Sequence, residues 1–310
     1  MRVLLSGASS FTGYWFCRQL LERGHQVQAL LQRESLESYS GTRKARVEKL
    51  HSLTECSFSI SFGSESFCEL VRSDGWDIYC HHGFRVENYR SDDFDVLAAV
   101  ADNTRNLKST LKILKSSGCE RILFTGSVFE AGEGLGGEGL PNITYYGLSK
   151  SLAWQIFSHE ASLQDFCLGK FVIPNPFGPL EEKRFTHYLM SRWEAGEPAE
   201  VRTPDYVRDN IHVDLLALDY AEFLETMPSE SGVWTRNPSG FVASQGVFTQ
   251  HLAEQVRRRT AWPCEVKLPK QADFPEPRIR INSEPALARH SSWSEEKAFD
   301  AFVNYYLNRG

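Results

Sequence analysis

Short apolar segments alternate with amphipathic ones through the first half of the chain. Helical periodicity is predicted for the segments 13–23, 93–116 and 146–158. Strands are predicted where short apolar runs are bounded by polar residues or glycine, at 2–6, 26–31, 57–62, 77–80, 121–125 and 170–173. Strands separated by helices are typical of a parallel sheet covered on both faces. The pattern therefore predicts an α/β fold with a doubly wound parallel sheet.

The character of the sequence changes after Pro174. Prolines and charges become frequent, and 210–213 looks like a late strand. Helices are predicted from about 241 and over 294–308, on either side of a proline-rich stretch. We expect a first domain over 1–174, with later returns to it near 210–240, and a small C-terminal lobe formed mainly by 175–310.

Composition and charge narrow the class of protein. Hydrophobic residues make up 41% of the 310 positions and charged residues 24%, which is ordinary for a globular protein. A net charge of -6 offers no basic face, so we expect no nucleic-acid partner. No apolar run reaches membrane length and no signal peptide is evident. The seven cysteines show no metal-ligand spacing, which favours reduced thiols in a cytoplasmic protein without a metal site.

A glycine-rich turn joins the first predicted strand to the first predicted helix. Gly7 allows the tight turn, and Gly13 lets the helix pack closely on the sheet. Ser10 stands where a middle glycine is usual. A helix N-terminus in this context suits the pyrophosphate of a dinucleotide, so the first domain is predicted to be a Rossmann-type, dinucleotide-binding domain. The candidate cofactor contacts in the turn are Gly7, Ser9, Ser10, Phe11 and Gly13.

The end of the second strand bears on which dinucleotide is bound. An acidic residue there would bind the ribose diol of NAD, whereas a cation would accept the 2′-phosphate of NADP. The strand ends Leu31-Gln32-Arg33, and no carboxylate occurs before Glu34. Arg33 is therefore a candidate cofactor contact, and NADP is slightly favoured over NAD. The alternative is that Arg33 is a solvated loop arginine.

Tyr146 and Lys150 lie four residues apart and so share one face of a predicted helix. An ammonium near the phenol favours phenolate and lowers the phenol pKa. The tyrosine can then exchange a proton with a hydroxyl or carbonyl while a hydride moves to or from the nicotinamide. The pair follows the fifth strand, which ends in Thr125-Gly126-Ser127, and ligands bind at the carboxyl ends of parallel strands.

Together these motifs resemble those of extended short-chain dehydrogenases/reductases, in the NAD-dependent epimerase/dehydratase family. The resemblance covers nearly the whole chain. It is carried by the Gly7–Gly13 turn, Asp77–His81, Thr125–Phe129, Tyr146-x-x-x-Lys150, Asn175–Pro179 and Arg208–Asp214. The last two segments are typical of the extended subgroup, which acts largely on nucleotide-linked sugars. The C-terminal lobe would then be mainly substrate-binding.

The resemblance implies roles for residues of the first domain. Tyr146 would be the catalytic acid/base, and Lys150 would also hold the nicotinamide ribose. Thr125 would hydrogen-bond the reacting oxygen, with Ser127 as the alternative. Apart from the resemblance, His81 and His82 lie at the end of the fourth predicted strand, where packing against the dinucleotide is favoured over catalysis or metal binding.

In the C-terminal lobe, Asn175 and Arg208 match positions that contact the phosphates or sugar of the substrate. The alternative for Arg208 is a salt bridge to Asp209 or Asp214. His187 is interpreted as a substrate contact or a residue of a helix surface.

Departures from the family's pattern limit the reaction. Sugar 4,6-dehydratases carry an Asp-Glu pair where this chain has Gly126 and Ser127, so dehydration is not expected. Ser127 also replaces the cysteine that 3,5-epimerases pair with a histidine. Ser64 replaces an acid that binds the adenine. An expected asparagine before the fifth strand aligns with Val100, with Asn103 displaced by three.

The sequence thus predicts an enzyme that reduces or epimerises a nucleotide-activated deoxysugar by hydride transfer at a ring carbon, C4 being favoured. The alternatives are a reductase of a non-nucleotide ketone and a non-catalytic cofactor-binding protein of the same fold. A homodimer is expected by resemblance alone. The sequence does not fix the nucleotide base, the sugar, or the choice between reduction and epimerisation.

Overall fold

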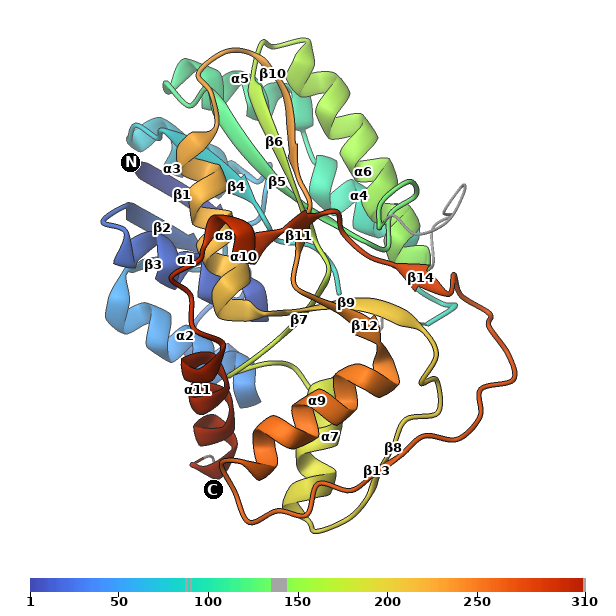
Figure 1. Ribbon diagram of the computed structural model, residues 1–310. Coiled ribbons are helices and arrows are strands. Elements are labelled where there is room, and N and C mark those ends of the chain that lie inside the picture. The colour runs from blue at the N-terminus through green and yellow to red at the C-terminus, as the bar shows by residue number, and fades with distance from the viewer. Residues whose placement is uncertain (87–88, 90, 135–143, 309–310) are drawn as a thin grey trace. The chain divides into compact units, whose positions relative to one another are not determined.

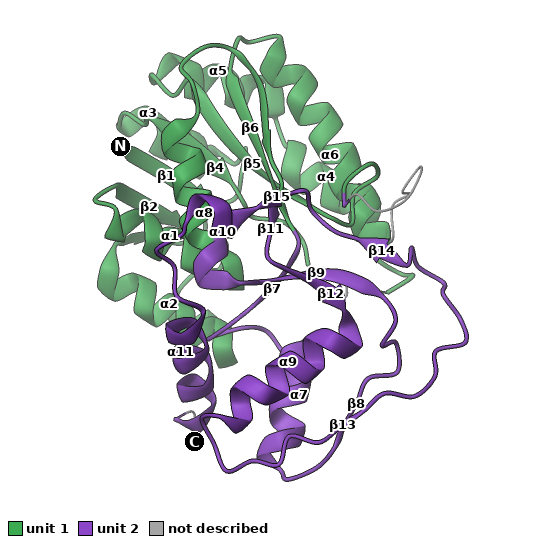
Figure 2. Cartoon of the chain, viewed as in Figure 1, with its two compact units in different colours: residues 1–133, 141–173, 217–237 green, residues 134–140, 174–216, 238–310 purple. Residues whose placement is uncertain are grey.

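A computed structural model describes residues 1–86, 89, 91–134 and 144–308 (Figure 1). The chain divides into two compact units, which Figure 2 shows in different colours. Unit 1 comprises 1–133, 141–173 and 217–237, and unit 2 consists mainly of 174–216 and 238–310. The helix α8 (Val213–Thr226) begins in unit 2 and continues in unit 1.

Unit 1 is built on a sheet of seven parallel strands in the order β10-β6-β5-β4-β1-β2-β3. The central strands are buried along almost their whole length, as expected for a sheet covered on both faces. The predicted doubly wound α/β fold is confirmed. The strands are β1 (Arg2–Ser6), β2 (Gln26–Leu30), β3 (Glu55–Ser57), β4 (Ile78–His81), β5 (Arg121–Ser127), β6 (Cys167–Ile173) and β10 (Gly232–Arg236).

Helices cover both faces of this sheet. On one face, Phe16 of α1 stacks on Tyr220 of α8 at 3.9 Å between ring centroids, and both rings contact Phe171 of β6. On the other face, α3, α5 and α6 pack into one apolar core that includes Phe67, Leu111 and Phe157. The helices are α1 (Phe11–Glu22), α2 (Gly41–Leu53), α3 (Glu65–Ser73), α4 (Val96–Thr104), α5 (Leu107–Ser116) and α6 (Tyr145–Ser162), with a short 3-10 helix at Leu36–Ser38.

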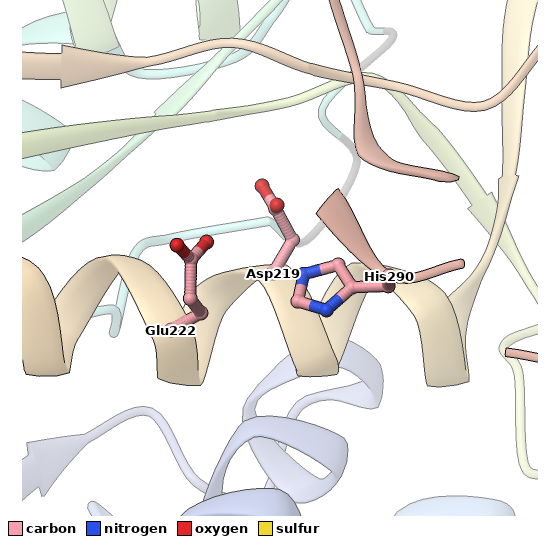
Figure 3. Close-up of side chains that lie close together, drawn as sticks. All are labelled: Asp219, Glu222 and His290. Atoms are coloured by element: carbon pink, nitrogen blue, oxygen red, sulfur yellow. The ribbon is translucent and has the colours of Figure 1, made fainter. Parts of the chain in front are cut away.

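The last part of α8 is tied to the edge strand β10 by charge. Asp219 and Glu222 project from neighbouring turns of α8 (Figure 3). Both carboxylates accept hydrogen bonds from Nη1 of Arg236, at 3.2 and 2.9 Å. Asp219 is fully buried, so this pairing offsets the cost of burying its charge.

The third strand lies earlier in the chain than predicted. The strand β3 pairs with β2 through Glu55–Ser57, and Ser59 then adopts a left-handed backbone with a φ of 59°. The predicted strand 57–62 is therefore wrong beyond Ser57. Phe62 belongs to a loop, and its side chain is buried in the core. The alternating apolar residues of 57–62 therefore reflect the packing of this loop and not a strand.

The predicted single helix 93–116 is broken into α4 and α5. Asn106 interrupts it with a φ of 50°, and its side-chain amide donates to the carbonyl of Gly63 at 3.0 Å. Gly63 lies against the break, since a Cβ there would be 2.0 Å from the carbonyl oxygen of Arg105. Contact with the loop at Gly63 thus separates α4 from α5, although the periodicity of apolar residues in 93–116 predicts one continuous helix.

Unit 2 contains a small sheet in which β12 (Phe241–Ser244), β14 (Ile279–Arg280) and β7 (Asn175–Phe177) all pair with β9 (Val207–His212). The predicted late strand 210–213 is confirmed for 210–212 within β9, whereas Val213 begins α8. The helix predicted from about 241 begins only at Gln245, because 241–244 pair with β9. The predicted helix 294–308 is confirmed as α11 (Glu295–Leu307), with Ser294 as its N-cap.

Three helices of unit 2 share one apolar core. Trp193, Phe248 and Phe302 are completely buried in it. They belong to α7 (Phe185–Glu194), α9 (Gln245–Arg257) and α11, respectively. The short elements of unit 2 are β8 (Ala199–Glu200), β11 (Pro238–Ser239), β13 (Val266–Lys267), β15 (Glu284–Pro285) and α10 (Ala286–Arg289).

All seven cysteines carry free thiols, and most of them are buried. Within the described ranges, none of the helices combines the length and the apolar character needed to cross a membrane.

Candidate active site

The glycine-rich turn is tightly packed at both of its glycines. Gly7 has a φ of 74°, and a Cβ there would lie 2.5 Å from the amide nitrogen of Gly83. A Cβ on Gly13 would lie 2.3 Å from the carbonyl oxygen of Gly7. Ser10 is the N-cap of α1, and its Oγ accepts the amide N–H of Gly13 at 3.1 Å. Side chains larger than hydrogen are therefore excluded at the two glycine positions.

The residues around the turn fit a pyrophosphate. The helix α1 has no acidic residue in its first turn, so no carboxylate balances the positive end of its dipole. Ser9 and Ser10 are half-buried, and Phe11 is buried at the start of the helix. Arg46 of α2 is fully buried, and its Nε–H donates to the carbonyl of Ser9 at 2.9 Å. A buried guanidinium beside a helix N-terminus suits an anionic group.

Arg33 lies in the exposed loop that follows β2. Its guanidinium donates to the carbonyl of Ser38 and lies 5.2 Å from the ring centroid of Tyr39. Tyr39 is buried, and its hydroxyl accepts the amide N–H of Arg33 at 3.3 Å. These contacts hold a cation at the end of the second strand.

His82 connects the turn to the end of β5. Its Nε2 lies 3.0 Å from Ser10 Oγ, and its Nδ1 lies 2.9 Å from Thr125 Oγ1. Burial lowers the pKa of His82 to about 3, so the ring is neutral and donates through one nitrogen while accepting through the other. The sequence predicts only a packing role for His82, because the residues around it do not indicate that Thr125, 43 residues away, is its partner.

His81 lies 2% exposed, behind the candidate site. Its Nδ1 is 2.9 Å from the Tyr79 hydroxyl, and its Nε2 is 2.9 Å from Oδ1 of Asn103 on α4. Both ring nitrogens are thus engaged within unit 1. Asn103 is the displaced asparagine noted in the sequence, and its contact supports β4 from the helix side.

Lys150 is buried beside the end of β5. Its Nζ donates to the carbonyl oxygen of Thr125 at 2.5 Å and lies 6.0 Å from the ring centroid of Tyr146. Burial lowers the pKa of Lys150 to about 8, with Glu130 opposing this shift and Lys170 adding to it. The structure therefore brings together three predicted residues, Thr125, Tyr146 and Lys150, in unit 1.

The position of Tyr146 follows from the start of α6. Thr144 is the N-cap, and its Oγ1 accepts the amide N–H of Gly147 at 3.1 Å. A Cβ on Gly147 would be 2.1 Å from the carbonyl oxygen of Phe129, so the glycine lets the first turn of α6 approach the loop after β5. The half-buried ring of Tyr146 lies edge-on to Phe84 at 5.9 Å.

Ser127 has a clear structural use in the loop after β5. Its Oγ accepts the amide N–H of Phe129 at 3.2 Å, and its own N–H donates to Oε1 of Glu130 at 2.7 Å. Thr125, in contrast, is linked to both His82 and Lys150.

The predicted substrate residues all lie in unit 2. Arg208 forms an ion pair with Glu276 at 3.0 Å, and its Nη1 donates to the carbonyls of Val207, Pro277 and Arg278. Its alternative interpretation as the partner of Asp209 or Asp214 is wrong. Arg208 pairs with Glu276 instead because β14 lies next to β9, and Glu276 comes just before β14 in the chain.

The other two predicted substrate residues have partners of their own. The Asn175 amide donates to the carbonyl of Asp209 at 3.2 Å, and Asn175 is half-buried. His187 lies on α7, half-buried, with its Nδ1 3.4 Å from the hydroxyl of Tyr306.

The parallel sheet and its glycine-rich turn define a Rossmann-type protein of the NAD(P)-binding class. The model of the NAD dependent epimerase/dehydratase family matches residues 3–233. The chain belongs to this family and is therefore an enzyme of the NAD(P)-dependent kind. A search of curated proteins finds no match.

Solved structures show the same fold over the whole chain. The UDP-glucuronic acid 4-epimerase of Bacillus cereus, in complex with UDP-glucuronic acid and NAD, is 16% identical, with a TM-score of 0.73 and 99% of each chain covered. The UDP-glucose 4-epimerase of Thermus thermophilus, in complex with NAD, is 17% identical, with a TM-score of 0.72 and 100% of each chain covered.

A third similar structure is a dehydratase. The dTDP-glucose 4,6-dehydratase of Streptomyces venezuelae, with NAD bound, is 16% identical, with a TM-score of 0.72, and the match covers 100% of this chain and 98% of that one. At these identities the likeness concerns the fold.

Proposed function

We propose that the protein is an NAD(P)-dependent reductase or epimerase of a nucleotide-activated sugar, with hydride transfer at a ring carbon, C4. The observation that carries this proposal is the buried Lys150, held 2.5 Å from the Thr125 carbonyl oxygen and 6.0 Å from the Tyr146 ring centroid. A lysine in such a place stabilises a phenolate at neutral pH. The 4-epimerases among the structural relatives support the choice of substrate class.

The residues of the proposed site have different tasks. Tyr146 gives a proton to, or takes one from, the oxygen on the reacting carbon. Lys150 stabilises the phenolate form of Tyr146 by its charge, and Thr125 hydrogen-bonds the same substrate oxygen. His82 is a positioning residue, because its contact with Thr125 Oγ1 orients that hydroxyl. A bound nicotinamide dinucleotide, held by the Gly7–Gly13 turn, supplies the hydride acceptor or donor.

Dehydration is disfavoured for a steric reason as well as a chemical one. Gly126 stands where dehydratases of the resembling group carry an acid. A Cβ at Gly126 would lie 2.8 Å from Lys170 Cε and 3.0 Å from Glu130 Oε1. The space beside β5 is thus filled by the buried Lys170–Glu130 pair.

Asn175, His187 and Arg208 would contact the nucleotide diphosphate or the sugar of the substrate. Arg208 would exchange its exposed partner Glu276 for a diphosphate, because a guanidinium binds phosphate oxygens in a bidentate manner.

A ligand screen tests the proposed function. We expect thermal stabilisation of the purified protein by a dinucleotide and by at least one UDP-, GDP-, CDP- or dTDP-sugar, by about 3 kcal/mol at a hundredfold excess over Kd. Tightly bound NAD(H) without net use of added NADPH would favour the epimerase, and NADPH consumption the reductase. No stabilisation by any nucleotide sugar would contradict the substrate class.

The choice of NADP over NAD is a further part of the proposal, supported by the cation at Arg33. We expect Arg33→Glu to weaken NADP binding by about tenfold or more, since a hydrogen bond to a charged group contributes about 1.5–3 kcal/mol. Titration calorimetry with both cofactors measures this. Arg202→Glu is the matched control, because Arg202 is 87% exposed in unit 2. Equal NADP affinity in the wild type and Arg33→Glu would remove Arg33 from the cofactor site.

The lowered pKa of Lys150 predicts a pH limit on activity. The charged lysine is the useful form, and with a pKa of about 8 it loses its charge as pH rises through that value. We therefore expect kcat/KM to fall by about tenfold per pH unit well above pH 8. A pH profile checks this, and Lys150→Arg should delay the fall because arginine keeps its charge. A profile that stays flat above pH 8 would contradict the role of Lys150.

We also propose a cytoplasmic homodimer, in which α4 and α6 of two copies pair. Leu97 on α4 is 78% exposed and Ile156 on α6 is 45% exposed, and the seven free thiols suit a reducing compartment. Analytical ultracentrifugation should show a dimer, and Leu97→Glu should dissociate it. Leu53→Glu, which changes an exposed side chain at the end of α2, should leave the dimer intact. A monomeric wild type would exclude this dimer.

A further inference from the structure

A small, partly open cavity lies in unit 2, between β9 and the helices α9 and α11. Its volume is about 120 Å³. Aromatic and aliphatic side chains make most of its lining, and these include Phe177, Leu215, Phe241, Phe248, Trp293 and Phe299. We call this space the β9 cavity. None of the predicted substrate residues Asn175, His187 and Arg208 lines it.

Two polar side chains of β9 also line the cavity. Asn210 and His212 are each 5% exposed, and they lie two positions apart on the strand, so both side chains face the same side. Asn210 Nδ2 and His212 Nε2 are buried without a hydrogen-bond partner among the described residues. His251 Nε2, which faces Glu295, is a third buried atom of the lining without a hydrogen bond among the described residues. Buried polar groups are almost always hydrogen-bonded, so the two unpartnered atoms of β9 require an explanation.

Both unpartnered atoms are hydrogen-bond donors. The Nδ1 of His212 accepts the amide N–H of Asp214 at 3.2 Å. Burial lowers the pKa of His212 to about 3, so the ring is neutral and its single proton resides on Nε2. Asn210 Nδ2 carries two protons. The cavity therefore needs an acceptor, and an oxygen with two lone pairs is the simplest group that serves both donors.

The charge of the lining favours a neutral acceptor over an anionic one. Glu295, at the start of α11, brings a carboxylate to the cavity, with Oε1 lying 3.3 Å from His251 Nε2. His212 is uncharged, so no cation of β9 would balance a second carboxylate beside Glu295. The size limits the ligand to a single ring, because an enclosed apolar cavity of about 150 Å³ holds one benzene molecule and this partly open cavity is of similar size.

We propose that the β9 cavity is a binding site for a small neutral molecule with a single-ring apolar body and a carbonyl oxygen, which accepts hydrogen bonds from Asn210 and His212. This site is additional to the proposed sugar-nucleotide site. Binding to this site is measured without any enzymatic turnover, so the result does not depend on the role of Tyr146.

The test compares acetophenone with ethylbenzene, which has nearly the same shape but no acceptor oxygen. NMR titration of the full-length protein should show acetophenone binding about tenfold more tightly, because an unmet buried donor costs about 1–3 kcal/mol. Asn210→Leu and His212→Phe should each remove most of that preference while leaving ethylbenzene bound. Benzoate should bind more weakly than acetophenone.

A filled cavity provides the matched control. Ala298 of α11 is buried in the lining, and Ala298→Leu should abolish binding of both compounds while dinucleotide binding to unit 1 is retained. The proposal is overturned if neither compound binds, as expected when water alone serves the two donors. Equal affinity for the two compounds, or tighter binding of benzoate, overturns it as well. If either Asn210→Leu or His212→Phe fails to fold, the remaining variant still tests whether the preference for acetophenone is lost.

Discussion

Replacing Tyr146 by phenylalanine should reduce kcat by about 10²–10⁴-fold, the usual contribution of a general acid or base. The change removes one oxygen and keeps the ring, which lies edge-on to Phe84. The affinity for the dinucleotide should therefore stay nearly unchanged. Steady-state kinetics and a cofactor titration of the same preparation measure both quantities.

The neighbouring tyrosine offers a matched control for this experiment. Tyr145 is also in the first turn of α6 but is 47% exposed. Tyr145→Phe should keep the wild-type rate. Full activity in Tyr146→Phe, or an equal loss in both variants, would mean that Tyr146 does not carry the proton.

The second large effect is expected at the glycine-rich turn. In Gly13→Ala, the new Cβ would lie 2.3 Å from the Gly7 carbonyl oxygen and 2.9 Å from His82 Cδ2. The turn and the start of α1 must move apart, and overpacking of this kind costs about 1–3 kcal/mol of stability. Loss of even one hydrogen bond to the pyrophosphate, worth about 1.5–3 kcal/mol, should weaken dinucleotide binding by about tenfold or more.

Calorimetric titration of the folded variant with NAD and NADP measures this loss. Gly75→Ala is the control, because a Cβ there meets nothing within 4 Å. If Gly13→Ala binds both dinucleotides as the wild type does, the cofactor does not rest on this turn.

Much of unit 1 could be predicted because its signals are local. The strand β1 was predicted at its observed bounds, since an apolar run there is closed by the Gly7 turn. The errors arose where distant contacts decide. Asn106 breaks a helix through its bond to Gly63, and Phe62 enters the core from a loop. The helices α2 and α3 were not predicted; α2 buries only Arg46, Val47 and Leu50, so its apolar stripe is weak.

The candidate site shows the same division. The pair Tyr146–Lys150 is visible in sequence because both residues lie on one helix face. The contact of Lys150 with Thr125, and the bridge from Ser10 through His82 to Thr125, depend on the order of strands in the sheet. The pairing of Arg208 with Glu276 likewise follows from β14 lying next to β9.

The central claim is that this chain moves a hydride between a dinucleotide on the Gly7–Gly13 turn and a sugar nucleotide beside Tyr146. Incubation with NADPH or NADH carrying tritium at the nicotinamide C4, and a panel of 4-keto nucleotide sugars, tests it most directly. We predict that the wild type places tritium on the sugar ring, and that Tyr146→Phe does so at a small fraction of that rate. Absence of label from every sugar of the panel, with the tritiated dinucleotide itself shown to be bound, would contradict the account.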